Sequence, residues 1–157
     1  MINKIIAIDP DVTKSGVAVI DIHNRTVNTY SMTFPDLMEY VETMPFNNTV
    51  RLVVEAGWLN KPNWHAAVSL AQAANIGMRI GRNHETGRKM VEMFERMGFS
   101  VSLIKPLNKR GSGASGKVTH PELEKVLKSR KIALNKKRTN QDERDSILIA
   151  IHEYDRL

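Results

Sequence analysis

Four acidic residues stand at the ends of expected structural elements. Asp9 ends one short apolar run, and Glu55 ends another. Asp142 and Asp145 are three residues apart at the start of an expected helix, so both project from one helix face. If the two apolar runs are neighbouring strands, Asp9 and Glu55 lie side by side. A final helix packed against that edge would then bring all four carboxylates together.

Such a cluster has a definite chemistry. Converging carboxylates repel one another, and burial raises the cost of their charge. Divalent cations relieve the repulsion, and hard oxygen ligands favour Mg²⁺ or Mn²⁺ over zinc. Two such ions can activate a water molecule and stabilise the leaving oxygen of a phosphodiester. The acids therefore predict phosphodiester hydrolysis by in-line attack, without a covalent enzyme intermediate.

Each acid also has a purely structural explanation. Asp9 can begin a turn with the Pro-Asp pair that follows it. Glu55 can end a strand and point into water. Asp142 can act in the capping of its helix and interact favourably with the helix dipole. Each of these explanations is the commoner one for a single acid, and only the joint placement of the four favours a metal site.

The elements that position these acids follow from apolar periodicity. The pattern predicts strands at 4–9, 16–20, 26–32, 50–55 and 99–104, and helices at 34–43, 63–97, 121–129 and 140–154. Gly81 and Gly87 interrupt the long helical pattern, so we expect two helices or one bent helix there. The order predicts one α/β domain over residues 1–157: a mixed five-stranded sheet, antiparallel in its first three strands and then parallel, flanked by helices.

Composition narrows the class of protein. The chain has 157 residues, of which 41% are hydrophobic and 25% charged, as in a globular domain. No stretch approaches the roughly 20 apolar residues of a membrane span, and Asp9 interrupts the N-terminal apolar run, so no secretory signal is expected. The absence of cysteine excludes disulfides, thiolate metal sites and a cysteine nucleophile. We therefore expect a cytoplasmic protein.

Positive charge is concentrated between residues 105 and 138. This segment has eleven Lys or Arg and two Glu, a net charge of +9 in a chain whose net charge is +6. Such a block attracts a polyanion through phosphate contacts, although a solvated basic surface is an equal alternative. It contains a loop, 106–116, whose GSGASG core we expect to be flexible and to order on contact with a ligand.

Four segments resemble, in order, the motifs of RuvC-type Holliday-junction resolvases. The segments are IAIDPDVTKSGVAVI at 6–20, VVEAGW at 53–58, NWHAAVSLAQAANIGM at 63–78 and QDERDSILIAIH at 141–152. In that family a strand-one aspartate is followed by Pro and a Gly-containing hairpin, and a later strand ends in glutamate with an aromatic residue three positions on. An Asp-x-x-Asp pair leads the last helix. The similarity spans nearly the whole chain, and the combination of motifs is more specific than any one of them.

The resemblance implies a ribonuclease-H-like fold and a crossover-junction endodeoxyribonuclease. It implies that the metal ligands, and with them the catalytic acids, are Asp9, Glu55, Asp142 and Asp145. Asp9 would be shared between two Mg²⁺ ions, for which Mn²⁺ can substitute. The cleaved strands would carry 5′-phosphate and 3′-hydroxyl ends.

The resemblance also assigns residues that touch DNA. Lys117 matches a basic residue near the scissile phosphate, where it can stabilise transition-state charge or serve as one phosphate anchor among many. Trp58 matches an aromatic residue that can stack on an opened base, although a core or loop anchor is an equal alternative. With the basic segment, the expected DNA contacts are Trp58, Lys105, Lys109, Arg110, Lys117, Lys136, Lys137 and Arg138.

The sequence departs from the family pattern in places. Asp11 follows Pro10 where cellular members usually have Gly, and Asn75 stands where Arg is frequent. The chain ends at Leu157 without the long tail of many cellular enzymes. These departures favour a compact phage or mobile-element relative acting in a host cytoplasm, and they leave strict junction selectivity and sequence preference open.

Three functions are compatible with these features. The first is a structure-selective DNA endonuclease that acts as a homodimer, because a four-way junction has approximate two-fold symmetry. The second is a less selective branched-DNA nuclease or an RNA-processing nuclease of the same fold. The third is a nucleic-acid-binding module that has lost catalysis, which the presence of all four acids disfavours.

Overall fold

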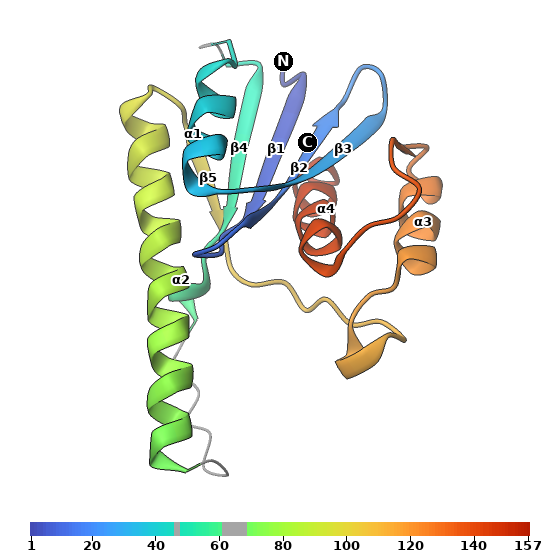
Figure 1. Ribbon diagram of the computed structural model, residues 1–157. Helices are drawn as coiled ribbons and strands as arrows, with labels where there is room; N and C mark the ends of the chain where they lie inside the picture. The colour runs from blue at the N-terminus through green and yellow to red at the C-terminus, as the bar shows by residue number, and fades with distance from the viewer. Residues whose placement is uncertain (46–47, 61–68) are drawn as a thin grey trace.

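The fold is built on a six-stranded sheet with strand order β5-β4-β1-β2-β3-β6 (Figure 1). The computed structural model describes residues 1–45, 48–60 and 69–157. The strands are β1 (Lys4–Asp9), β2 (Ser15–Asp21), β3 (Thr26–Met32), β4 (Val50–Glu55), β5 (Val101–Ile104) and β6 (Ala133–Leu134). The first three strands are antiparallel, and β4, β5 and β6 each pair in parallel with a neighbour. This is the mixed α/β sheet that the sequence predicted.

Helices cover both faces of the sheet. The helices are α1 (Phe34–Glu42), α2 (Leu70–Arg96), α3 (His120–Ser129) and α4 (Gln141–Tyr154), and two short 3₁₀ turns lie at Gly57–Leu59 and Ala114–Gly116. Alternate residues of β1 divide between two cores: Ile6 and Ile8 belong to the core beneath α1 and α2, whereas Ile5 and Ala7 belong to the core beneath α3 and α4. This division explains why β1 is apolar throughout, since both of its faces are buried.

The structure adds one strand to the predicted five. β6 is only two residues long and pairs Ala133 with Thr26 and Leu134 with Val27 of β3. Two residues give no readable alternation of polar and apolar side chains, so the sequence pattern could not predict this edge.

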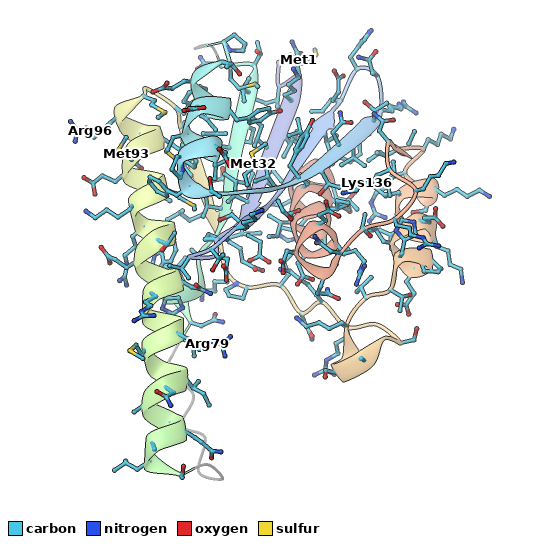
Figure 2. All side chains as sticks on the ribbon, viewed as in Figure 1. Met1, Met32, Arg79, Met93, Arg96 and Lys136 are labelled. Atoms are coloured by element: carbon cyan, nitrogen blue, oxygen red, sulfur yellow. The ribbon has the colours of Figure 1, made fainter. Side chains whose placement is uncertain are left out.

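The long helical pattern forms one helix rather than two. α2 runs without interruption from Leu70 to Arg96, so each glycine weakens it by about 1 kcal/mol without ending it. The predicted start of this helix, 63–68, lies outside the described residues. Residues 69–82 are all exposed, and the first half of α2, which carries Arg79, extends beyond the sheet (Figures 1 and 2).

The last helix starts at a well-defined cap. The Asn140 side chain accepts a hydrogen bond from the Glu143 N–H, and the Glu143 carboxylate accepts one from the Asn140 N–H. Lys136 pairs with the same buried glutamate. This reciprocal capping fixes where α4 begins and hence which residues occupy its first turn. Among the described residues, no helix combines the length and hydropathy needed to cross a membrane.

Candidate active site

Two of the predicted acids become neighbours through strand pairing. β1 and β4 are parallel, and their register pairs Ile8 with Val54. Asp9 and Glu55 directly follow these two residues, so both carboxylates emerge at the same end of adjacent strands. The prediction that these strands are neighbours is confirmed.

A glycine brings the last helix to this edge. Gly16 pairs with Asp9 across β1 and β2, and a Cβ atom at Gly16 would collide with the backbone carbonyl of Asp142. The first turn of α4 therefore approaches the backbone of β2 more closely than any other residue type would permit. This close approach places Asp145 beside the strand acids.

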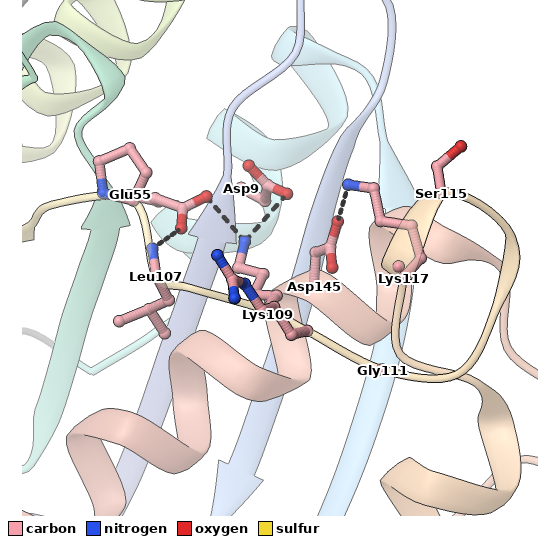
Figure 3. Close-up of a pocket in the computed structure, with 11 residues that line it drawn as sticks. Asp9, Glu55, Leu107, Lys109, Gly111, Ser115, Lys117 and Asp145 are labelled. Atoms are coloured by element: carbon pink, nitrogen blue, oxygen red, sulfur yellow. Dashed lines mark hydrogen bonds and ion pairs between the residues drawn. The ribbon is translucent and has the colours of Figure 1, made fainter.

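Three of the four acids line one cavity of about 590 Å³. Figure 3 shows Asp9 from β1, Glu55 from β4 and Asp145 from α4 facing the same space. The cavity is closed on its other side by the loop between β5 and α3, which contributes Lys109, Arg110 and Lys117 among others. Oxygen donors from three separate elements thus converge, as the sequence predicted for these three.

Asp142 lies next to the cavity without lining it, which corrects the expectation that all four acids meet in one space. Residues three apart on a helix are offset around the axis, so Asp145 turns inward while Asp142 remains exposed. Partial burial of its carboxyl, followed by the charges of Asp11 and Asp145, raises the pKa of Asp142 above its usual value. Asp142 therefore shares the electrostatic environment of the site from its rim.

Lys109 lies inside the cluster of acids. Its Nζ is 2.8 Å from Glu55 Oε2 and 3.7 Å from Asp9 Oδ2, and its side chain is only 11% exposed (Figure 3). The Leu107 N–H donates to the other oxygen, Glu55 Oε1, at 2.9 Å. Lys109 was predicted to contact DNA from the basic surface, whereas the structure turns it toward the carboxylates. No local pattern in the sequence indicates this direction, because the path of the loop decides it.

Lys117 occupies a more open position. Its Nζ is 3.7 Å from Asp145 Oδ2, and half of its side chain is exposed. The ammonium group can therefore contact Asp145 and a ligand in the cavity together.

Burial has the largest influence on the pKa of the Asp9 carboxyl. Burial raises the pKa of Asp9 from 3.8 to about 7; Lys109 lowers it in part, while Glu55 and Asp145 raise it further. A carboxyl that titrates near neutrality between two other acids is stabilised by any additional cation.

Gln141 positions one acid and was missed in the sequence. Its Nε2 donates to Asp145 Oδ1 at 2.9 Å, and its Oε1 accepts from Arg144 at 3.0 Å. Arg144 also donates to the backbone carbonyl of Val118, at the end of the loop that closes the cavity. The i,i+4 spacing of Gln141 and Asp145 was the available signal, since such pairs face each other on a helix.

The Gly/Ser-rich loop, for which we expect flexibility, has hydrogen bonds within itself and to α3. The Gly111 N–H donates to the Gly116 carbonyl, and the Gly113 N–H donates to the Lys117 carbonyl. Glu122 accepts hydrogen bonds from the N–H groups of Ser112 and Thr119, and these bonds lower its pKa to about 2. A Cβ at Gly111 would lie 2.5 Å from the Val118 Cα, so a glycine at this position allows the two backbone segments to pack closely.

The donors fit a divalent cation in chemistry, although not in their present arrangement. Among the residues that the structure describes, no three His, Asp or Glu side chains are close enough together to hold a metal ion as they stand. The carboxylates of Asp9, Glu55 and Asp145 nevertheless share one cavity, and carboxylate oxygens are the ligands that Mg²⁺ prefers.

Trp58 is anchored against α2. Its ring lies over Gly87, where a Cβ would come within 2.6 Å, and the guanidinium of Arg88 is 5.6 Å from the ring centroid. His84 contacts it edge-on at 6.4 Å between ring centroids. Trp58 is partly buried in the core beneath α2 and does not line the acid cavity. These contacts favour the anchor explanation.

Asp11 is used within its own loop. Its Oδ1 accepts from the Thr13 N–H at 2.8 Å, and its Oδ2 accepts from Asn83 of α2 at 3.2 Å. Asp11 therefore holds the β1–β2 loop against α2.

The other predicted DNA contacts are accessible to solvent. Lys105, Arg110, Lys137 and Arg138 are exposed, and Arg110 also lines the acid cavity. Lys136 pairs with Glu143 while half of its side chain stays accessible, and Figure 2 shows it on the side of α3 and α4. Of these residues, only Arg110 is among those that line the cavity.

Comparison with known proteins places this geometry in a fold family. No protein-family model matches the chain, and no curated protein is a significant match. In structure it is similar to T. thermophilus RuvC in complex with a Holliday junction substrate, with a TM-score of 0.53 and 13% sequence identity over 98% of this chain and 94% of that chain. A second structure of RuvC, also from Thermus thermophilus, matches with a TM-score of 0.47 and 14% identity, over 98% and 95% of the two chains. The chain therefore has the ribonuclease-H-like α/β fold of RuvC.

Proposed function

We propose that the chain is a Mg²⁺-dependent endonuclease that cuts branched DNA, with the four-way junction as its substrate. The observation that carries the proposal is the convergence of Asp9, Glu55 and Asp145 on one cavity bordered by lysines. The RuvC structure of the same fold is bound to a Holliday junction, which supports this choice of substrate.

The acids would hold the metal, with Asp142 completing the ligand set from the rim. A bound divalent cation, Mg²⁺ or Mn²⁺ and two ions in the predicted site, supplies the positive charge that activates a water and stabilises the leaving oxygen of a phosphodiester. Gln141 keeps the Asp145 carboxylate oriented through its hydrogen bond. Lys117 is half exposed beside Asp145, so its ammonium group can hold the scissile phosphate.

The basic surface would grip the arms of the junction. Phosphate contacts by Lys105, Arg110, Lys137 and Arg138 would supply salt-sensitive affinity without sequence selectivity. Lys136 can join them from its pair with Glu143. Trp58, which lies in the 3₁₀ turn that follows Glu55, belongs to the structural framework in this proposal.

A homodimer suits the substrate. A four-way junction presents two equivalent strands, and two active sites related by two-fold symmetry would nick both. Sedimentation equilibrium with and without junction tests this point, and a monomer under both conditions would contradict it. An origin in a phage or mobile element, with action in the host cytoplasm, remains a prediction from Asp11 and Asn75.

Cleavage of a labelled synthetic junction tests the activity. Wild type and Asp9→Asn would be compared on the junction and on its linear duplex, with Mg²⁺ or with EDTA. We expect paired nicks in the junction that are lost with EDTA or with Asp9→Asn and are absent from the duplex. Faster cutting of a structured RNA would identify an RNA-processing nuclease instead.

A second function is favoured by a specific observation. Lys109 already neutralises part of the charge of Asp9 and Glu55, as in a domain that needs no metal. Such a domain would bind nucleic acid without cutting it. Tight, salt-sensitive junction binding with no scission in either Mg²⁺ or Mn²⁺ would establish this catalytically silent module.

A further inference from the structure

Residues 107–109 engage both carboxylate oxygens of one predicted metal ligand. The Leu107 N–H bonds to Glu55 Oε1, and Lys109 Nζ bonds to Glu55 Oε2. The same ammonium group reaches Asp9 Oδ2 at 3.7 Å. A stretch of three residues, more than fifty positions away in the sequence, thus covers the acids of both β1 and β4 (Figure 3).

The Lys109 ammonium group is almost withdrawn from solvent. Its side chain is 11% exposed, as is that of Glu55, whereas the Lys117 side chain of the same loop is 50% exposed. Burying an ammonium group is costly unless a carboxylate pairs with it, so Lys109 is held by the acids themselves. Lys117 is free to meet a ligand, and Lys109 is not.

A divalent cation and Lys109 compete for the same oxygens. A metal ion ligated by Glu55 would lie beside the Lys109 ammonium group, which is 2.8 Å from Glu55 Oε2, and two cations on one carboxylate repel each other. It also brings two positive charges in place of one, which suits a cluster of three acids better. Binding of the metal ion at Glu55 therefore opposes binding of the Lys109 ammonium group there, and the reverse.

We propose that Lys109 is a built-in, displaceable cation that holds the acids together in the metal-free protein and leaves Glu55 when a divalent metal binds. The inference rests on the proposed metal-dependent function. Metal binding would free residues 107–109 from Glu55, and the released Lys109 would join the basic surface that faces DNA. Metal binding would thereby make the Lys109 ammonium group available to contact the phosphate backbone of DNA.

Mn²⁺ titration of the free protein, without DNA, tests the competition. Isothermal titration calorimetry would compare wild type, Lys109→Met and Lys125→Met. Lys125 is exposed on α3, so its substitution removes the same charge away from the acids. We expect Lys109→Met to bind Mn²⁺ at least about tenfold more tightly than wild type, an effect of the size known for groups around metal ligands, and Lys125→Met to match wild type.

Hydrogen exchange of the wild-type protein supplies an independent measurement that needs no variant. The Leu107 amide should exchange faster with saturating Mn²⁺ than in EDTA, because its bond to Glu55 is lost. The Ser112 amide, which bonds to Glu122, serves as an internal reference and should change little.

The outcomes separate this inference from the proposed function. Equal or weaker Mn²⁺ binding by Lys109→Met, or a Leu107 amide that stays protected with metal bound, would overturn the displacement while leaving a metal-dependent nuclease intact. No Mn²⁺ binding by wild type or by Lys109→Met would overturn both proposals.

Discussion

The two pairs of acids at the site are built in different ways. Asp9 and Glu55 come from adjacent parallel strands, so sheet register alone sets their separation. Asp142 and Asp145 belong to one helix, and their distance from the strands depends on how α4 docks on β2. The buried Lys109 pairs with both strand acids. The half-exposed Lys117 pairs with Asp145 of the helix, and Asp142 lies on the rim. Hydrogen bonding within the sheet therefore fixes the strand acids, whereas the packing of α4 on β2 fixes the helix acids.

The largest effect is expected when either pair loses an acid. Asp9→Asn and Asp145→Asn should each reduce the rate of junction cleavage about a thousandfold or more, because bound metal contributes several kcal/mol and about 1.4 kcal/mol is a factor of ten. Single-turnover kinetics in Mg²⁺ would measure the rates. Glu95→Gln, at an exposed position of α2, should cleave as wild type does. A loss confined to Asp9→Asn would show that the helix pair takes no part.

Docking of the helix pair can be disturbed separately. Gly16→Ala should displace α4, since the new Cβ meets the Asp142 carbonyl, with a loss of about 1–3 kcal/mol in the free energy of unfolding. Cleavage should fall by about a hundredfold, the effect of a misplacement of roughly 1 Å. Denaturant unfolding and cleavage assays would measure both.

Gly77→Ala is the matched control for that experiment. Nothing lies within 4 Å of a Cβ at Gly77, and the helix is exposed there, so this variant should be as stable as wild type or more stable. A Gly16→Ala protein with normal stability and activity would show that α4 does not depend on this close approach.

Losing the hydrogen bond that orients the Asp145 carboxylate should reduce cleavage less than losing the carboxylate itself. Gln141→Ala removes the hydrogen bond to Asp145 and should reduce cleavage by about tenfold, or Mg²⁺ affinity by a similar factor. The free energy of unfolding should change little, because Gln141 lies at the first position of α4 and is only partly buried. Unchanged cleavage and Mg²⁺ titration curves would argue that Asp145 is held by packing alone.

The smallest effect concerns stability, and it belongs to the strand pair. In the folded protein the pKa of Asp9 is about 7 against 3.8 for an ordinary aspartate, so the folded state holds this proton more tightly. Below about pH 4 both states are protonated; as the pH rises toward 7, the unfolded state gains by ionising freely. Metal-free stability should therefore fall over this range and level off above pH 7.

The contribution of Asp9 to the pH dependence of stability is the difference between wild type and Asp9→Asn. Thermal unfolding of wild type and Asp9→Asn in EDTA, between pH 4 and pH 8.5, should show Asp9→Asn gaining stability relative to wild type as the pH rises. Added Mg²⁺ at pH 8 should stabilise wild type more than Asp9→Asn. Parallel pH curves for the two proteins would contradict an elevated pKa at this carboxyl.

Much of the fold could be predicted from local patterns. β1 is apolar on both faces because it is central, and Asn140 caps α4 through a capping box visible in the sequence. The prediction of five strands missed β6, whose signal was too short, and of the two outcomes left open for the long helical pattern the structure shows a single helix. Gly87 lies under Trp58, so a residue interpreted as an interruption is a packing position.

The sequence by itself determined which acids end the strands and the face of the last helix, because strand alternation and helix periodicity are local properties of the chain. Only the tertiary structure decided that Lys109 turns toward Glu55, that Asp142 stays on the rim, and that Glu122 ties the Gly-rich loop. These relations join residues far apart in the chain, and a loop's path between them depends on the packing of everything it crosses. Local propensity does not encode that path, and so the direction of a lysine side chain in this loop follows only from the folded molecule.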